Sequence, residues 1–554
     1  MELVLVGLSG SGKSSLARAL AERTQAQLLD LDGEIERRAG RSIAAIFASG
    51  DEAAFRSLEA SLVAELAGEP AEAGPGLRRV IAVGGGAVLD PVNRWQLFRG
   101  RRVAWLDAPT EDLAARLRDG GQAERPLLSG GSLAERLATQ RAERERFYAA
   151  GTRIPAGEPP AAILERLVRL TEDDERRAAQ AGTRLLDART PLGRIVLGLG
   201  IVETSVGEIL GELGARRVAL LSEPVAWRLH GERLAGALAG GGLAVEPVLV
   251  PRGERAKSFR VLERTLRELA RRGLERRDPD LAVGGGALGD VAGLAAATYL
   301  RGVPLVAVPT TLLAQLDASI GGKSAIDLPE GKNLVGAFRQ PVGIVIDLAL
   351  LDTLPPRQVR AALGEAVKMA ALGDERLLAR LEAFGPSLVR SPRAAVASGA
   401  LAEIVERAAW AKVEIVMADE REALGRAGRI RLNLGHSLGH AIEAAAGYRG
   451  ILHGEAVAHG LRGAFAVGRA MGLTPPARAE RFEALLDRLG LALAAARVAQ
   501  EAVVKHLAAD KKTAGGRLRW VLPTADGVTV RSDVPDAAVA EGLAAALQGR
   551  GGRA

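Results

Sequence analysis

The chain has 554 residues, too many for one hydrophobic core, and this length predicts about two to four domains. The formal net charge is +7, but basic and acidic residues are interleaved and aromatic residues make up only 3%, which argues against nucleic acid as a partner. There is no cysteine, so disulfides and thiolate zinc sites are excluded and any metal must be bound by His, Asp or Glu. The longest strongly apolar stretch, 291–300, is far shorter than the roughly 20 residues of a membrane helix, so we expect a cytoplasmic protein without a membrane contact.

The order of apolar strands and helical patterns predicts an α/β protein. Residues 1–170 alternate short strands (3–6, 80–83, 103–106) with helices, as in a parallel sheet, and 171–190 are expected to form a helix and a linker. A second α/β domain is expected over 191–350, with strands at 195–197, 218–221, 245–250, 281–283 and 305–308. From 351 to 554 the apolar spacing is mainly helical, with one short strand at 518–522.

Lysine is rare in this chain, since only nine of its 74 basic residues are lysines. None of them falls between Lys13 and Lys257, and most lie in recognisable sequence settings. A lysine retained in an arginine-rich chain marks a place where a compact ammonium is needed and a planar guanidinium does not fit.

The first candidate site is a phosphate-binding loop. The sequence from Gly7 to Ser14, Gly-Leu-Ser-Gly-Ser-Gly-Lys-Ser, follows an apolar strand and opens a helical pattern. Glycines let backbone N–H groups surround phosphates at a helix N-terminus, the lysine reaches the terminal phosphates and the serine ligates Mg²⁺. The residues expected to bind ATP and Mg²⁺ are Gly10, Ser11, Gly12, Lys13, Ser14 and Ser15.

The phosphate acceptor has to be recognised by the rest of this domain. Asp30 and Asp32 are expected to close a second strand, where alternation would point both carboxylates to the same side, one for Mg²⁺ and one for an acceptor hydroxyl. A glycine turn and three arginines complete the candidate set, since arginine pairs with carboxylates and transferring phosphoryl groups. They are Gly84–Gly86, Arg56, Arg125 and Arg144.

Residues 1–170 therefore resemble shikimate kinase. The resemblance implies that Asp32, Arg56 and Arg144 bind shikimate above the turn at Gly85, that Arg125 on a lid contacts ATP phosphates, and that Asp30 helps to place Mg²⁺. Arg146 replaces a proline that the family usually has near Arg144, so Arg141 remains an alternative.

The second candidate site combines a glycine turn with a histidine cluster. Gly284 to Asp290, Gly-Gly-Gly-Ala-Leu-Gly-Asp, follows a buried-type strand and is typical of a diphosphate cradle, although such a run alone is weak evidence. His436 and His440 are four residues apart and share a helix face, and His453 follows. With Glu365 these residues predict a zinc site made of nitrogen and oxygen only.

Residues 186–547 resemble 3-dehydroquinate synthase, with motifs along nearly their whole length. The resemblance implies that Glu365, His436 and His453 bind Zn²⁺ (or another divalent ion such as Co²⁺), while His440 faces the substrate. It implies NAD⁺ binding by Glu254, Lys257, Gly285, Gly286, Gly289, Asp290, Thr310 and Thr311. Substrate binding is implied for Arg301, Lys323, Lys332, Asn333, Lys412, Arg429 and Asn433, with Asp317 and Lys368 at the ring hydroxyls.

Three details stay open in this half. Arg426 is an alternative to Arg429 because of three extra residues in that loop, either Lys511 or Lys512 is expected to face substrate, and Ser222 stands where the family often places an Asp or Asn near the ribose. Arg301 is expected to reach from a neighbouring subunit, which implies a homodimer through this half.

The two resemblances predict an enzyme with two activities. The first half would phosphorylate shikimate with ATP, and the second would convert 3-deoxy-arabino-heptulosonate 7-phosphate to 3-dehydroquinate with NAD⁺ and zinc, releasing phosphate. The rival for the second half is a metal-dependent NAD alcohol dehydrogenase, which would leave the many lysines without an anionic partner. A related sugar-phosphate cyclase is the closer alternative.

Overall fold

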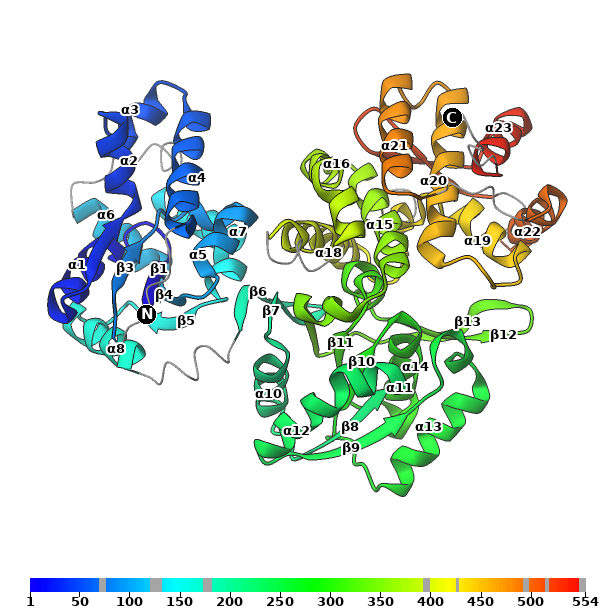
Figure 1. The fold of residues 1–554 in the computed structure, drawn as a ribbon, viewed down its shortest axis with the longest axis horizontal. Helices are drawn as coiled ribbons and strands as arrows, with labels where there is room; N and C mark the ends of the chain where they lie inside the picture. The colour runs from blue at the N-terminus through cyan, green and yellow to red at the C-terminus, as the bar shows by residue number, and fades with distance from the viewer. Residues whose placement is uncertain are drawn as a thin grey trace. The chain divides into compact units, whose positions relative to one another are not determined.

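The computed structural model describes residues 1–68, 76–119, 132–172, 182–391, 399–424, 428–491, 498–513 and 518–547. The chain divides into two compact units (Figure 1). The first comprises Met1–Thr190 with Arg194–Thr204, and the second comprises Pro191–Gly193 with Ser205–Ala554. No helix in the described ranges is long and apolar enough to cross a membrane.

The first unit is built around a parallel five-stranded sheet in the order β2-β3-β1-β4-β5. Its strands are β1 (Glu2–Val6), β2 (Gln27–Asp30), β3 (Arg79–Ala82), β4 (Arg102–Asp107) and β5 (Thr152–Pro155). Every residue of β1 and β3 is buried, as expected for strands covered by helices on both faces. Because the strands are parallel, their carboxyl ends meet at one edge, where the phosphate loop and the glycine turn lie.

The helices of this unit begin at local sequence signals. Ser132 and Glu135 form a capping box at the start of α7, and Asp90 caps α5 with Pro91 at its first position. The helices are α1 (Lys13–Thr24), α2 (Leu31–Ala39), α3 (Ile43–Ala48), α4 (Glu52–Gly68), α5 (Pro91–Phe98), α6 (Thr110–Asp119), α7 (Leu133–Tyr148) and α8 (Pro160–Glu172).

The second unit starts with a parallel sheet whose strands run in the order β14-β11-β10-β8-β9. These are β8 (Arg217–Ser222), β9 (Ala244–Leu249), β10 (Asp280–Gly284), β11 (Leu305–Pro309) and β14 (Gly343–Asp347). Helices α10 (Val202–Glu212), α11 (Pro224–Ala226), α12 (Glu232–Gly240), α13 (Phe259–Arg271) and α14 (Gly286–Thr298) accompany it. An antiparallel hairpin of β12 (Lys323–Leu328) and β13 (Gly331–Phe338) follows η6 (Ala314–Ala318).

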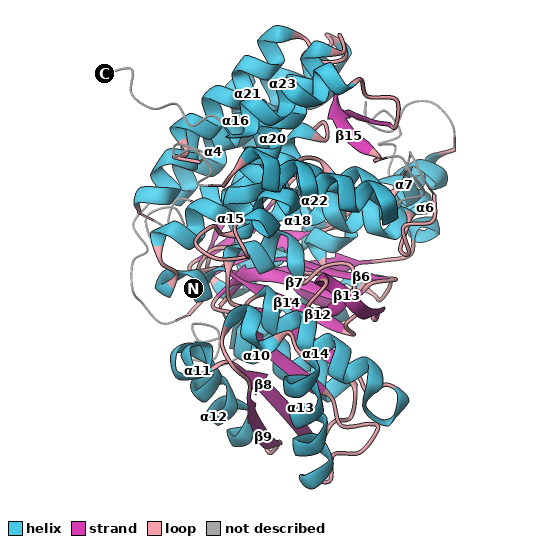
Figure 2. Ribbon diagram, turned by 90° about the vertical axis from the view of Figure 1, so that its right-hand side faces the viewer, coloured by secondary structure: helices cyan, strands magenta, loops and turns pink. Residues whose placement is uncertain are grey.

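The rest of the second unit is mainly helical (Figure 2). Its helices are α15 (Pro356–Ala371), α16 (Glu375–Arg390), α18 (Ala400–Ala418), α19 (His436–Ala445), α20 (His453–Ala470), α21 (Pro476–Arg488), α22 (Gln500–Thr513) and α23 (Asp536–Leu547). A small hairpin of β15 (Trp520–Pro523) and β16 (Val528–Arg531) interrupts them. A hydrophobic core joins α19, α20, α22 and α23 and includes Leu438, Ile442, Val467 and Leu522.

The fold class and most predicted strands agree with this architecture, with two differences. The stretch 171–190, expected to be helix and linker, contains strand β6 (Thr183–Thr190), which precedes β7 (Gly193–Leu199); residues 173–181 lie outside the described part. Strand β2 ends at Asp30, so the expectation that Asp32 shares its strand is wrong: Asp32 lies in the first turn of α2. Carboxylates are favoured in a first helical turn, so Asp32 suits this position.

Candidate functional sites

The phosphate loop has the backbone that its glycines predict. Gly10 and Gly12 have positive φ (83° and 85°), and a Cβ at Gly7 would lie 2.6 Å from the carbonyl oxygen of Leu106. Helix α1 begins at Lys13, whose Nζ donates to the carbonyls of Gly7 and Leu8, both at 2.9 Å. The N-terminus of α1 therefore opens onto a loop closed by an ammonium, which suits a triphosphate.

The three glycines after β3 are each faced by one of the predicted acceptor-binding side chains. A Cβ at Gly84 would lie 2.7 Å from Asp32 Oδ1, one at Gly85 would lie 3.4 Å from Arg144 Nη1, and one at Gly86 would lie 2.8 Å from Arg56 Nη2. One carboxylate and two guanidinium groups thus converge on a floor without side chains. This arrangement fits a small acceptor that carries both a carboxylate and hydroxyl groups.

The structure distinguishes Arg144 from Arg141, the alternative residue for binding the acceptor. Arg144 is buried beside Gly85, whereas Arg141 donates to Asp107 Oδ1 at 2.7 Å and to the carbonyl of Ala108 at 3.0 Å. Arg141 lines a separate hollow at the carboxyl ends of β4 and β5, together with Thr110, Arg153 and Pro155. The geometry therefore favours Arg144 for the acceptor.

Two residues that sequence reasoning missed support this glycine floor. Glu59 is buried and its Oε2 accepts from Arg56 Nη1 at 2.9 Å; burial raises the pKa of Glu59, with Arg56 acting in the opposite direction. Tyr148 is buried and its hydroxyl donates to the carbonyl of Gly85 at 2.5 Å, and burial raises the pKa of Tyr148 to about 12. Glu59 lies one helical turn after Arg56 on α4, which is the signal that could have identified it.

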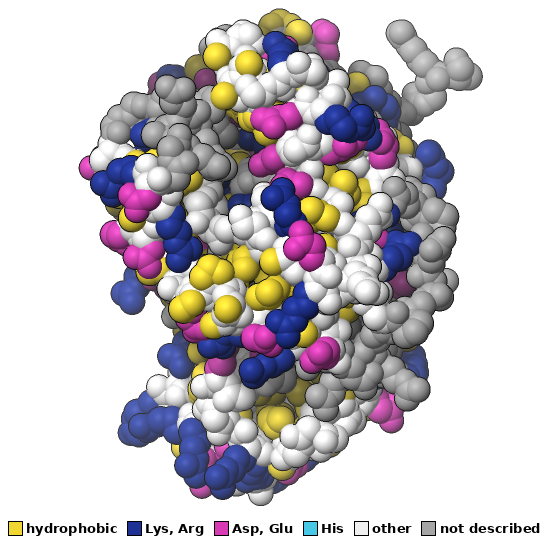
Figure 3. Space-filling model, turned by 90° about the vertical axis from the view of Figure 1, so that its left-hand side faces the viewer, with side chains coloured by type: hydrophobic (Ala, Val, Ile, Leu, Met, Phe, Trp, Pro, Cys, Tyr) yellow, Lys and Arg dark blue, Asp and Glu magenta, His cyan; other side chains and the backbone are white. Residues whose placement is uncertain are grey.

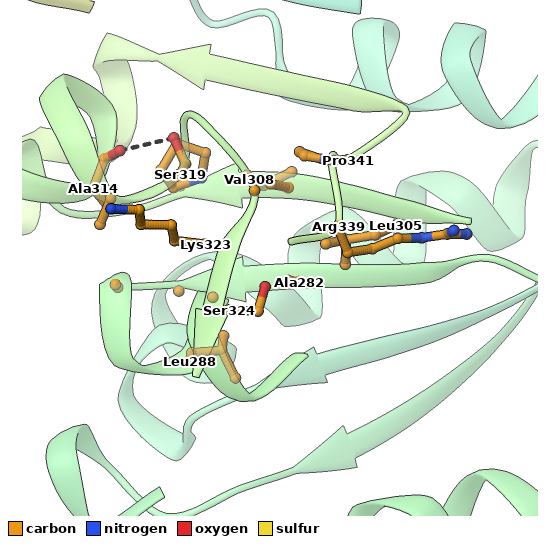
Figure 4. Close-up of a pocket in the computed structure, with 18 residues that line it drawn as sticks. Ala282, Leu288, Leu305, Val308, Ala314, Ser319, Lys323, Ser324, Arg339 and Pro341 are labelled. Carbon is orange, nitrogen blue, oxygen red and sulfur yellow. Dashed lines mark hydrogen bonds between the residues drawn. The ribbon is translucent and has the colours of Figure 1, made fainter. Parts of the chain in front are cut away.

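In the second unit, the predicted cofactor turn joins β10 to α14. A Cβ at Gly284 would lie 2.3 Å from Leu288 Cδ2, so a side chain there would require Leu288 to move. The turn lines a cavity that also contains Lys323 and Arg339 (Figure 4). Thr311 contacts Gly285, and the missed residue Glu223 lies near the same glycine while its Oε2 accepts from the backbone N–H of Gly253. A carboxylate after a neighbouring strand is what a ribose hydroxyl needs, and Glu223 directly follows Ser222.

Lys257, Asp290 and Asn333 form one cluster beside this turn. Lys257 is buried and its Nζ donates to Asp290 Oδ2 at 2.7 Å and to the side-chain oxygen of Asn333. Burial raises the pKa of Asp290 to about 6, with Lys257 acting in the opposite direction. Asn333 therefore lies with the predicted cofactor residues and not beside Lys323. Thr310 is buried just after β11, and its backbone N–H donates to the carbonyl of Gly284 at 2.9 Å.

The predicted metal ligands converge on one buried carboxylate. His436 Nε2 and His453 Nε2 each lie 3.4 Å from Glu365 Oε1, and Glu365 is completely buried. Lys368 Nζ lies 2.5 Å from the other oxygen, Oε2. A buried carboxylate with one oxygen facing two imidazole nitrogens fits a divalent cation.

The second nitrogen of each imidazole is already held. His436 Nδ1 lies 3.1 Å from the carbonyl of Leu434, and His453 Nδ1 lies 3.0 Å from Glu443 Oε2. Such contacts turn the Nε2 lone pair toward a metal. Burial lowers the pKa of His436 to about 3; for His453 burial acts in the same direction, but Glu365 and Glu443 raise its pKa to about 10.

His440 forms the third corner of the histidine cluster. Its ring lies 5.2 Å from that of His436 and 5.8 Å from that of His453, so the three imidazoles also form a possible metal-binding group. Unlike Glu365, His440 is exposed. This difference favours Glu365 as the third ligand and is compatible with the substrate-facing role that the family resemblance implies for His440.

Two buried lysines and Asp317 extend this cluster. Asp317 Oδ1 lies 2.9 Å from Lys412 Nζ and 3.6 Å from Lys368 Nζ. Burial lowers the pKa of Lys412, while for Lys368 the carboxylates of Glu365 and Asp317 outweigh burial and raise the pKa. The pKa values of these two neighbouring ammonium groups are therefore shifted in opposite directions. This suits residues that orient substrate hydroxyls and exchange protons with them.

The remaining predicted substrate residues meet at a glutamate that sequence reasoning missed. Glu422 Oε2 lies 2.6 Å from Lys323 Nζ, and its Oε1 accepts from Asn433 Nδ2 at 3.3 Å. Arg429 is buried below them and donates to the carbonyls of Gly321 and Glu420. The acidic residues Asp419, Glu420 and Glu422 follow Lys412 in the sequence, and this cluster is the signal that could have identified Glu422.

Two predicted residues lie apart from these groups. Lys332 Nζ lies between Glu254 and Glu443, and Arg301 is exposed on a turn where Leu300 and Arg301 both have positive φ. Arg125 and the alternative Arg426 lie outside the described residues, as do the side chains of Lys511 and Lys512.

Figure 3 shows charged side chains of both signs scattered over the face, with hydrophobic side chains near its centre and a mainly basic group at its lower end. Many arginines in the first unit are paired with acidic residues, such as Arg38 with Glu65 and Arg23 with Glu165. The positive net charge is therefore not gathered into one broad basic surface on this face.

Comparisons with known proteins match both units. Family models for the N-terminal and C-terminal parts of 3-dehydroquinate synthase match residues 247–361 and 362–513, and a model for shikimate kinase matches residues 9–172. The 3-dehydroquinate synthase of Gloeobacter violaceus is 44% identical over 324 residues, which cover 58% of this chain and 87% of that protein.

Solved structures resemble the second half. The 2-epi-5-epi-valiolone synthase of Streptomyces hygroscopicus subsp. jinggangensis, with NAD⁺ and Zn²⁺ bound, has a TM-score of 0.58 and 28% identity, and the match covers 64% of this chain and 96% of that one. A 2-deoxy-scyllo-inosose synthase with carbaglucose-6-phosphate, NAD⁺ and Co²⁺ has a TM-score of 0.56 and 26% identity, covering 63% and 96%.

The matched ranges contain the sites described above. Residues 247–513 include the glycine turn, Glu365, His436 and His453, and residues 9–172 include Lys13 and the glycine floor. Both resemblances predicted from the sequence are thereby confirmed. The chain belongs to the 3-dehydroquinate synthase family and carries, in its first unit, a domain of the shikimate kinase family.

Proposed function

We propose that this chain catalyses two reactions: ATP-dependent phosphorylation of shikimate, and conversion of 3-deoxy-arabino-heptulosonate 7-phosphate to 3-dehydroquinate with release of phosphate. The observation that carries the second activity is the buried Glu365 oxygen, 3.4 Å from two imidazole nitrogens, in the same unit as a glycine-rich cofactor turn. The glycine floor between Asp32, Arg56 and Arg144 supports the first.

In the kinase half, the residues divide between acceptor and donor. Arg56 and Arg144 bind the acceptor carboxylate by charge-assisted hydrogen bonds, and Asp32 accepts a hydrogen bond from the hydroxyl to be phosphorylated. Lys13 can leave the carbonyls of Gly7 and Leu8 for the terminal phosphates of ATP, while Ser14 and Asp30 hold Mg²⁺. Catalysis here is mainly positioning and charge stabilisation.

In the synthase half, Glu365, His436 and His453 would hold zinc, and the Gly284–Gly286 turn with Glu254, Lys257 and Thr311 would hold NAD⁺. When bound, zinc acidifies the hydroxyl that is oxidised, and NAD⁺ takes a hydride that it later returns. Asp317 and Lys368 orient ring hydroxyls and exchange protons with them.

Anion recognition in this half depends on the lysines and Arg429. We assign the substrate carboxylate to Lys412, Arg429 and Asn433 and the phosphate to Lys323, an exposed ammonium that shares Glu422 with Asn433. An alcohol dehydrogenase acting on an uncharged alcohol would give these cations no anionic substrate group to bind. A carboxylated sugar phosphate explains them, because both anionic groups must stay oriented through several steps.

A homodimer would complete the substrate phosphate site. Leu300 and Arg301 have φ values of 48° and 67°, an unusual pair for residues with side chains, and Leu300 is 40% exposed. Strain of this kind persists where the surroundings or the function require it. We therefore assign Arg301 to the phosphate site of a partner subunit; size measurement of the purified protein and loss of phosphate release in Arg301→Ala test this.

The synthase assay supplies 3-deoxy-arabino-heptulosonate 7-phosphate, Zn²⁺ and substoichiometric NAD⁺, and follows phosphate release and NADH absorbance together. Phosphate released over many turnovers without accumulating NADH is the expected result. Accumulation of NADH without phosphate would indicate an ordinary dehydrogenase. ADP formation that depends on shikimate tests the kinase half in the same preparation.

A further inference from the structure

The hairpin β12–β13 contacts the helical part of the second unit through Lys332. Its Nζ lies 3.2 Å from Glu254 Oε1, 3.5 Å from Glu443 Oε1 and 4.6 Å from the centre of the Tyr448 ring. Glu254 belongs to the short turn η4 (Gly253–Ala256), whereas Glu443 belongs to α19. The ammonium is thus shared between carboxylates from the sheet part and the helical part of one unit.

Each of these carboxylates leads directly to a different site. Glu443 Oε2 lies 3.0 Å from His453 Nδ1, on the opposite side of the ring from the nitrogen that faces Glu365. Glu254 lies 3.9 Å from Lys257 Nζ, which donates to Asp290 beside the cofactor turn. Lys332 is therefore the midpoint of a continuous series of contacts between the metal ligands and the cofactor turn.

These contacts do not favour Lys332 as a residue that binds the anionic substrate directly, although substrate binding is what the family resemblance implies for it. Two carboxylates within 3.5 Å already balance its charge and would repel an incoming dianion. Glu443 and Glu254 raise the pKa of Lys332 against the effect of burial, so the ammonium stays charged and stays with its carboxylates. Lys323, with a half-exposed side chain, is better placed to receive phosphate.

We propose that Lys332 is a positioning residue that couples the NAD⁺ site to the metal site, so that each ligand increases the affinity for the other. The inference rests on the proposed function of the synthase half. The contact with Glu443 forms only when the hairpin and α19 lie at this distance, and the same contact orients the glutamate that holds His453. A ligand at either site stabilises this arrangement, so the second ligand loses less free energy to ordering the hairpin and α19 and binds more tightly. Thermodynamic linkage requires that each ligand increase the affinity for the other by the same factor.

The experiment measures binding and needs no turnover. The full-length protein is titrated with Zn²⁺ against a chromophoric chelator, with and without saturating NAD⁺, and its NAD⁺ affinity is measured with and without Zn²⁺. In the wild type we expect each ligand to increase the affinity for the other by the same factor, within about 5- to 150-fold. In Lys332→Met this factor should fall to near one.

Lys505→Met is the matched control, because Lys505 is exposed on α22 and its loss removes the same charge; it should keep the wild-type factor. Tyr448→Leu removes the ring beneath Lys332 at an exposed position and should lower the factor in part, which keeps the test available if Lys332→Met does not fold.

Two outcomes would overturn the coupling and leave the proposed activity standing: a wild type that binds both ligands independently, or a folded Lys332→Met with the full wild-type factor. A wild type that binds neither zinc nor NAD⁺ would instead overturn the proposed synthase activity together with the inference.

Discussion

Gly86→Ala tests whether the glycine floor sets acceptor binding in the kinase half. Gly86 has φ −96° and ψ −11°, a conformation open to alanine, so the substitution adds a Cβ without backbone strain. That Cβ would lie 2.8 Å from Arg56 Nη2 and 3.0 Å from Nη1, closer than real contacts allow. The guanidinium must move, and it is one of two expected to bind the acceptor carboxylate.

The magnitude follows from the contact that is lost. A hydrogen bond to a charged group contributes about 1.5 to 3 kcal/mol, which corresponds to about 10- to 150-fold in kcat/KM for shikimate. The KM for ATP should stay unchanged, because the phosphate loop lies before α1 and is not altered. Steady-state kinetics with each substrate varied in turn measure both values.

Gly33→Ala is the matched control. Gly33 lies in α2 next to Asp32, and the nearest atom to its added Cβ is 3.9 Å away, so shikimate kinetics should be retained. Unchanged kcat/KM for shikimate in Gly86→Ala would refute the role of the floor. An equal loss in the control would show that any perturbation near Asp32 has this effect.

Three further predictions concern the loop, the metal and a buried acid. Lys13→Ala should abolish phosphorylation and leave phosphate release by the synthase intact; parallel assays check this, and loss of both would show that the halves are not independent. His436→Ala should lose bound zinc and synthase activity, measured by metal analysis, and full metal content would remove the ligand assignment. Burial raises the pKa of Asp280 to about 8, so between about pH 4 and 8 the folded state binds a proton that the unfolded state has lost. The free energy of unfolding should therefore fall by about 1.4 kcal/mol per pH unit as pH rises through this range. Asp280→Asn should remove this pH dependence, as measured by urea unfolding.

The parts of the site that the sequence predicts well are motifs whose residues lie close together in the chain. The phosphate loop requires glycines at fixed offsets before Lys13, and His436 and His440 share a helix face at a spacing of four, so local geometry carries both predictions. Asp32 shows the limit of such reasoning. Its separation of two residues from Asp30 is compatible both with the alternation of a strand and with the first turn of a helix. Only the packing of α2 decides between the two.

Side-chain partners across long separations could not be predicted in this way. Lys332 meets Glu443, 111 residues later, and Lys323 meets Glu422, 99 residues later. Those pairs depend on how the hairpin β12–β13 packs beside the helical part of the unit, and hydrophobic periodicity does not report that geometry. Glu223 was missed for a similar reason, since it lies near Gly285 and Gly253, which are far from it in the sequence.

Three of the nine lysines share one structural setting in the second unit. Lys257, Lys332 and Lys368 each lie within 4.0 Å of two or more carboxylates from different elements, and all three are at least partly buried. Arginines in this chain also meet two carboxylates, as Arg38 and Arg481 do, but their side chains are more exposed than those of the three lysines. Arg194 donates through two nitrogens to the one carboxylate of Asp187. The three lysines therefore each connect two acidic groups in a largely buried setting, beside the cofactor turn, the metal ligands and the buried acid Asp317.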